Sequence, residues 1–155
     1  MATILVVEDD PIQLFLWRLW FELAGHEVVD ACDGVMALER IKYRSPHVVV
    51  TDMCMPAMSG GELIRQLRAD PVTARIPIVG MSTQVRYRDI GEDAFLSKPL
   101  DPNDLIEAAE TLIERTPRGP AQKFLARSIG RWRRCKKWRC TLPFISGPSG
   151  HARAL

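Results

Sequence analysis

The chain has 155 residues, 46% of them hydrophobic and 26% charged, a balance typical of a globular domain with a buried core. Its net charge of +2 conceals a division: residues 1–116 hold all 19 acidic residues and 11 of the 21 basic ones, and residues 117–155 hold the other 10 basic residues. The length excludes two ordinary domains, and the longest apolar stretch, residues 12–24, is too short and too charged to span a bilayer.

Strands and helices are predicted to alternate along residues 1–116. Apolar or β-branched runs predict five strands, at residues 4–7, 27–31, 47–51, 76–80 and 94–96. Capping residues and helical periodicity predict helices at residues 11–24, 34–41, 61–68 and 101–115. Because parallel strands need crossover connections, this order predicts an α/β fold, a doubly wound five-stranded parallel sheet with helices on both faces.

Polar side chains follow four of the predicted strands. They are Glu8, Asp9 and Asp10 after the first strand, Asp52 after the third, Ser82 after the fourth and Lys98 after the fifth. The working site of such a sheet lies outside the carboxyl ends of its strands, so we expect these groups to converge at one edge.

Four segments in this order carry a family resemblance. They are Ile-Leu-Val-Val-Glu-Asp-Asp at residues 4–10, Asp-Met-Cys-Met-Pro-Ala-Met-Ser-Gly at residues 52–60, Ser82, and Leu-Ser-Lys-Pro-Leu at residues 96–100. Together they resemble the receiver domain of bacterial two-component response regulators, over about residues 3–115. The resemblance implies a flavodoxin-like receiver fold and a single-domain response regulator of a phosphorelay, which is not an enzyme.

The resemblance also implies a role for each residue of the site. Asp52 accepts the phosphoryl group from a histidine kinase or a histidine phosphotransfer protein. The Mg²⁺ ligands are Glu8, Asp9, Asp52 and the backbone carbonyl of Cys54, and oxygen is the ligand that this hard cation prefers. Lys98 and Ser82 bind the phosphoryl oxygens, and the ring of Phe95 fills the space that the Ser82 hydroxyl leaves. The downstream protein is not specified by the sequence.

One stretch departs from the family pattern. Residues 82–98 are about six residues short for this family, so we expect a shortened fourth helix, a stub or a loop. The family often dimerises through this region, so we expect a homodimer of this chain to differ from the family's usual one.

The first predicted helix is apolar on two sides. At 100° per residue, one face holds Ile12, Phe15, Leu16, Leu19 and Leu23, and we expect this face to be core. Leu14, Trp17 and Phe21 lie on the opposite face, where we expect a surface for partner docking or dimerisation. Scattered exposed apolar residues would be the alternative.

Residues 117–155 are predicted to be a basic extension, disordered or partly helical. A basic amphipathic segment could contact a membrane or nucleic acid, so a transcriptional or membrane-associated regulator is the alternative function. The segment is too short for a standard DNA-binding domain. A phosphohydrolase on a related α/β fold is a further alternative, and it would need a general acid near the nucleophile. A family of such enzymes carries a second Asp two residues after the nucleophile, a position that Cys54 occupies here. The four cysteines and the lack of a signal peptide lead us to expect a cytoplasmic protein with free thiols.

Overall fold

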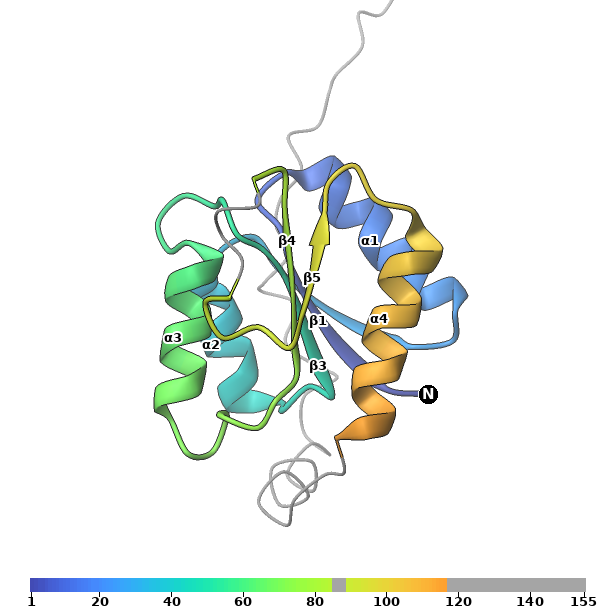
Figure 1. Ribbon diagram of the computed structural model, residues 1–155. Coiled ribbons are helices and arrows are strands. Elements are labelled where there is room, and N and C mark those ends of the chain that lie inside the picture. The colour runs from blue at the N-terminus through green and yellow to red at the C-terminus, as the bar shows by residue number, and fades with distance from the viewer. Residues whose placement is uncertain (85–88, 117–155) are drawn as a thin grey trace, which may run out of the picture.

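Five parallel strands form one sheet in the computed structural model, which describes residues 1–84 and 89–116 (Figure 1). The strands are β1 (Thr3–Val7), β2 (Glu27–Ala31), β3 (Val48–Asp52), β4 (Ile78–Ser82) and β5 (Ala94–Ser97), in the order β2-β1-β3-β4-β5. The helices are α1 (Pro11–Leu23), α2 (Gly34–Tyr43), α3 (Gly60–Ala69) and α4 (Pro102–Arg115). The predicted fold is confirmed, and the strand order reverses direction between β1 and β3, where such folds place their sites.

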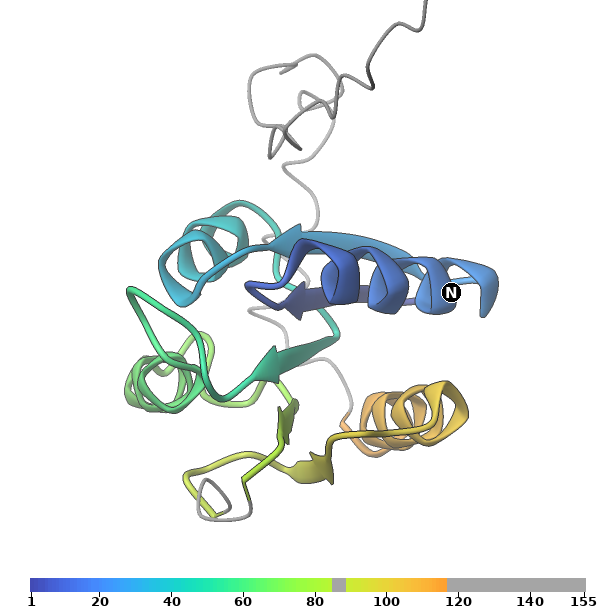
Figure 2. The same ribbon diagram turned by 90° about the horizontal axis from the view of Figure 1, so that it is seen from above.

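The helices cover the two faces of the sheet in pairs. Figure 2 shows α1 and α4 on one face and α2 and α3 on the other. Every residue of β1, β3 and β4 is buried, because the central strands of a parallel sheet pack against helices on both sides. Alternate residues therefore enter two separate cores: Ile4 and Val6 pack toward α1 and α4, whereas Leu5 and Val7 pack toward α2 and α3.

Capping residues fix where the helices begin. Asp10 accepts hydrogen bonds from the backbone of Ile12 and Gln13 at the start of α1, and Asp101 does the same for Asn103 in α4. Gly25 follows α1 with φ +85°, a left-handed conformation that stops a helix. These caps agree with the sequence prediction and place each helix start beside the end of a strand.

The predicted orientation of α1 is wrong. Leu14, Trp17 and Phe21 are buried in the core beneath the sheet, with Phe21 fully inaccessible. The face expected to be core is exposed instead; it consists of Ile12, Phe15, Leu16, Leu19 and Leu23. Both sides of the helix are apolar, so its periodicity could not choose between them. The buried side carries the larger aromatic rings, which fill the space between α1, α4 and the sheet.

The connection from β4 to β5 contains no helix in its described residues, 83–84 and 89–93. Residues 85–88 are not described, so the predicted shortened helix is tested only in part. Arg68 of α3 donates hydrogen bonds to the carbonyl oxygens of Ala74, Ile76 and Gly91 and forms an ion pair with Asp93. The arginine thus ties this connection to α3.

The predictions for residues 117–155 lie outside the described residues. Within the part of the chain that the structure describes, no helix is both long enough and apolar enough to cross a membrane.

Candidate functional site

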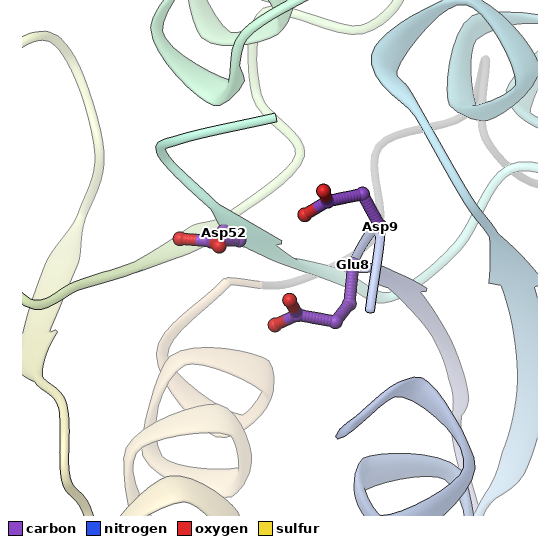
Figure 3. Close-up of side chains that lie close together, drawn as sticks. All are labelled: Glu8, Asp9 and Asp52. Carbon is purple, nitrogen blue, oxygen red and sulfur yellow. The ribbon is translucent and has the colours of Figure 1, made fainter. Parts of the chain in front are cut away.

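The polar residues predicted to converge do so at the carboxyl edge of the sheet. Asp52 is the last residue of β3, and Glu8 directly follows β1, the neighbouring strand. Figure 3 shows the carboxylates of Glu8 and Asp9 extending toward the end of β3, where Asp52 lies. Lys98 follows β5 and reaches the same place. Parallel strands produce this convergence because all of them end at one edge.

The three carboxylates form a compact acidic cluster. One oxygen from each of Glu8, Asp9 and Asp52 lies within 4.8 Å of the others. Glu8 and Asp52 are buried, at 1% and 8% exposed, whereas Asp9 is open to solvent. Two buried carboxylates and one exposed carboxylate at this spacing suit a hard divalent cation that keeps some of its waters on the solvent side. The residues therefore fit the Mg²⁺ site that the resemblance implies.

Lys98 lies between two of these acids. Its ammonium Nζ is 2.7 Å from Glu8 Oε2 and 3.2 Å from Asp52 Oδ2. The lysine side chain is only 11% exposed, so its charge acts on both carboxylates with little screening by water. A compact ammonium between two carboxylates can move toward a new anionic group at Asp52 without leaving the site.

Glu8 carries the main electrostatic cost of the site. Burial raises the pKa of the Glu8 carboxyl above its ordinary value, and the nearby Asp52 charge adds to this. The hydrogen bond and charge of Lys98, and a hydrogen bond from Trp17, lower that pKa without offsetting the effect of burial. Glu8 therefore lies where burial disfavours an ionised carboxylate, and a bound divalent cation would favour the ionised form.

Ser82, Cys54 and Phe95 border the acids. Ser82 is 1% exposed, and its hydroxyl accepts a hydrogen bond from the backbone N–H of Gln84 at 3.1 Å. The Cys54 thiol lies 3.8 Å from that hydroxyl, and the Cys54 N–H donates to Asp52 Oδ1 at 3.4 Å. Phe95 is half-buried and packs against the core of α2 and α3. Cys54 therefore contacts both Ser82 and Asp52. Phe95 lies on β5, the strand that pairs with β4.

The loop after Asp52 is packed against the backbone of Asp52 itself. A Cβ atom on Gly60 would lie 2.2 Å from the carbonyl oxygen of Asp52, so this position has room only for glycine. Ser59 caps α3 in a reciprocal arrangement with Glu62. The start of α3 therefore fixes the backbone at the end of β3.

Two contributors to the site were missed by the sequence interpretation. Trp17 was assigned to a docking surface, yet its indole N–H reaches Glu8 Oε2 at 3.2 Å. Gly60 was quoted only as part of a motif. The paired glycines at residues 60–61, at the start of a helix, were a signal of close backbone approach. No comparable signal pointed to Trp17, because its contact depends on how α1 is rotated.

Comparisons with known proteins agree with this geometry. The model of the response regulator receiver domain family matches residues 4–110. Protein PilH of Pseudomonas aeruginosa is 29% identical over 119 residues, which cover 73% of this chain and 98% of PilH. The DNA-binding transcriptional regulator RpaA of Synechocystis sp. is also 29% identical, over 77% of this chain but 52% of RpaA. The chain thus spans about half the length of RpaA.

Solved structures show the same architecture. The crystal structure of a putative response regulator from Chloroflexus aurantiacus superposes with a TM-score of 0.70 at 27% identity, and the match covers 74% of this chain and 98% of that one. Since the family model spans well over half of the sequence and the acidic cluster and lysine occupy the expected strand ends, the chain belongs to the response regulator receiver domain family.

Proposed function

We propose that this chain is a phosphorelay receiver that accepts a phosphoryl group on Asp52 from a phosphohistidine, with Mg²⁺, and signals through protein–protein contacts. The observation that carries the proposal is the placement of Lys98, which bridges Asp52 and Glu8 beside a cluster of three carboxylates. A carboxylate nucleophile and a phosphoryl donor are both negative, so transfer needs positive charge at the site, which Lys98 supplies and a cation held by the three carboxylates would add.

The chemistry follows from the positions of the residues. A carboxylate oxygen of Asp52 attacks phosphorus in line, the new P–O bond forms as the P–N bond breaks, and the departing histidine nitrogen takes the electron pair. The ammonium of Lys98 is close enough to Asp52 to form an ion pair with the oxygens of the transferred phosphoryl group. Glu8, Asp9 and Asp52 would hold Mg²⁺, with the Cys54 carbonyl as the further ligand that the family suggests. The bound ion would neutralise oxygens of the transferring group.

The acyl phosphate would then change the site. Its oxygens would accept a hydrogen bond from the Ser82 hydroxyl. That hydroxyl now accepts one from the Gln84 N–H, and it would rotate toward the phosphoryl group. Phe95 would follow into the vacated space, and the surface around β5 would change shape. In this proposal the protein is a stoichiometric acceptor rather than an enzyme.

The exposed apolar face of α1 is the surface we propose for the phosphodonor. This face consists of Ile12, Phe15, Leu16, Leu19 and Leu23. A donor histidine must approach Asp52 over the carboxyl edge of the sheet, and α1 begins at that edge, three residues after Glu8. In the family, the corresponding helix packs against the helical bundle of the kinase. We therefore propose docking on the side of α1 opposite to the one first predicted, because that side is the exposed one.

The test is intact mass after incubation with acetyl phosphate and Mg²⁺. We expect the gain of one phosphoryl group, which Asp52→Asn and removal of Mg²⁺ should each abolish. Asp9→Asn should reduce labelling, because it removes a cation ligand while keeping the acceptor. Labelling that persists in Asp52→Asn would contradict the proposal. So would the absence of labelling together with the absence of Mg²⁺ binding by calorimetry.

A further inference from the structure

The indole of Trp17 and the ammonium of Lys98 contact the same oxygen of Glu8. Trp17 Nε1 lies 3.2 Å from Glu8 Oε2, and Lys98 Nζ lies 2.7 Å from it. Trp17 is 6% exposed and Glu8 1% exposed, so the indole contact is shielded from water. Both donors hold Oε2, which leaves Oε1 of the same carboxylate for another partner.

We propose that Trp17 is a positioning residue of the phosphoacceptor site. Its indole N–H fixes the Glu8 carboxylate so that Oε1 is presented to the cation, and the inference rests on the Mg²⁺-dependent function proposed above. Partners that hold a metal-ligating carboxylate from behind set its orientation and thereby the affinity for the metal. Trp17 is suited to this because an indole only donates, and Oε2 must be given a donor.

The surroundings of Trp17 keep its ring in place. Asp10 lies two residues after Glu8, caps α1 and fixes the first turn of the helix. The ring of Trp20 packs edge-on against the ring of Trp17, with centroids 4.8 Å apart and planes inclined at 66°. The indole is thus held from the helix side, by packing that does not involve the acids.

The Trp17 contact would become more important during phosphoryl transfer. Lys98 divides its charge between Glu8 and Asp52, and a phosphoryl group on Asp52 would draw the ammonium toward its oxygens. The bond from Trp17 does not depend on Asp52. It therefore leaves Glu8 with a donor at each stage, where a buried carboxylate without one would be strongly disfavoured.

The experiment compares Trp17→Phe with Trp20→Phe in the full chain, by calorimetric titration with MgCl₂. Each substitution removes an indole from the same packed pair, but only the first removes a contact to Glu8. We expect Mg²⁺ affinity to fall about tenfold in Trp17→Phe, as for the loss of other partners behind metal ligands, and to change less than about twofold in Trp20→Phe. Equal affinities in wild type and Trp17→Phe, or equal losses in both variants, would overturn the proposal.

A second measurement does not depend on the folding of a variant. In ¹H–¹⁵N spectra of the wild type, the indole N–H resonance of Trp17 should shift when MgCl₂ is added, and that of Trp20 should not. An unmoved Trp17 resonance in a protein that binds Mg²⁺ would refute the positioning role and leave the receiver function intact. No Mg²⁺ binding by the wild type itself would overturn both.

Discussion

Glu8 shows how much of this site works against the stability of the fold. Its carboxylate is buried at the end of β1, beside the charge of Asp52, and two donors only partly compensate for the loss of water. A neutral side chain of the same shape would avoid that cost. The residue types at this edge were predictable, since carboxylates and a lysine at strand ends suit phosphoryl chemistry. The balance of burial and hydrogen bonding at Glu8 was not, because it depends on a tryptophan in a neighbouring helix.

Glu8→Gln should therefore stabilise the metal-free protein above the acid range. Because the folded-state pKa of Glu8 is raised, the proton favours folding: its contribution is full below the ordinary pKa and is lost as pH rises through the folded-state value. Glutamine stays neutral throughout. In urea unfolding without divalent cations, the advantage of Glu8→Gln should be larger at about pH 8 than at about pH 4, by about 1.4 kcal/mol for each unit of pKa shift.

The control is Glu107→Gln, which neutralises an exposed carboxylate on α4. It should show no such pH-dependent advantage. If Glu8→Gln were no more stable than wild type at about pH 8, the attraction of Lys98 would outweigh burial, contrary to the balance described here.

At the scale of single elements, α1 marks the limit of what the sequence could predict. The positions and caps of the strands and helices followed from local residues, and Asp10, Gly25 and Asp101 act as expected. The rotation of α1 could not be predicted, because both of its faces are apolar and only the shape of the space beneath the sheet decides between them. The same rotation places Trp17 against Glu8. Because the rotation was not known, neither the core-facing side of α1 nor the contact of Trp17 with the site could be predicted.

The two faces of α1 should respond differently to the same substitution. Phe21→Ala removes a fully buried ring and should lower the free energy of unfolding by about 3–5 kcal/mol. Phe15 is 61% exposed, so Phe15→Ala should change it by less than about 0.5 kcal/mol. Urea unfolding checks both. A large loss of stability in Phe15→Ala would contradict the assigned rotation of α1.

Phosphotransfer from a kinase should be slower in Phe15→Ala if the exposed face receives the donor.

The start of α3 makes a second prediction for an element. Gly60→Ala places a methyl group against the Asp52 carbonyl, which belongs to the backbone and must itself shift. We expect a loss of about 1–3 kcal/mol in stability and slower labelling by acetyl phosphate. Gly61→Ala is the matched control, since its added Cβ meets side-chain atoms alone, the nearest being Ile90 Cδ1 at 3.3 Å, and no backbone. Similar behaviour of the two variants would show that the contact at residue 60 does not hold Asp52 in place.

At the scale of the molecule, the acidic part of the chain, residues 1–116, builds two hydrophobic cores from its described residues. Their buried residues run from Ile4 to Ala109, and the partly buried ones extend to Ile113. Residues 1–116 carry eight more acidic than basic residues, whereas residues 117–155 carry ten basic residues and no acid. The charge division, the linker-like Pro- and Gly-containing segment after residue 116 and the extent of the family resemblance predict a boundary near residue 116. It stays a prediction, because residues 117–155 lie outside the described part of the chain.

A chain ending at Thr116 should therefore unfold cooperatively, within about 0.5 kcal/mol of the full chain, when urea unfolding is followed at about 0.15 M salt. A chain ending at Asp101 is the informative comparison, because it lacks α4 and exposes the core that Leu105 and Ala109 cover. That shorter chain should lose its cooperative transition. A clearly lower midpoint for the chain ending at Thr116 would show that residues 117–155 stabilise the domain. If the difference vanished at high salt, the attraction between the basic segment and the acidic domain would be its cause, since salt screens exposed charges but not apolar contacts.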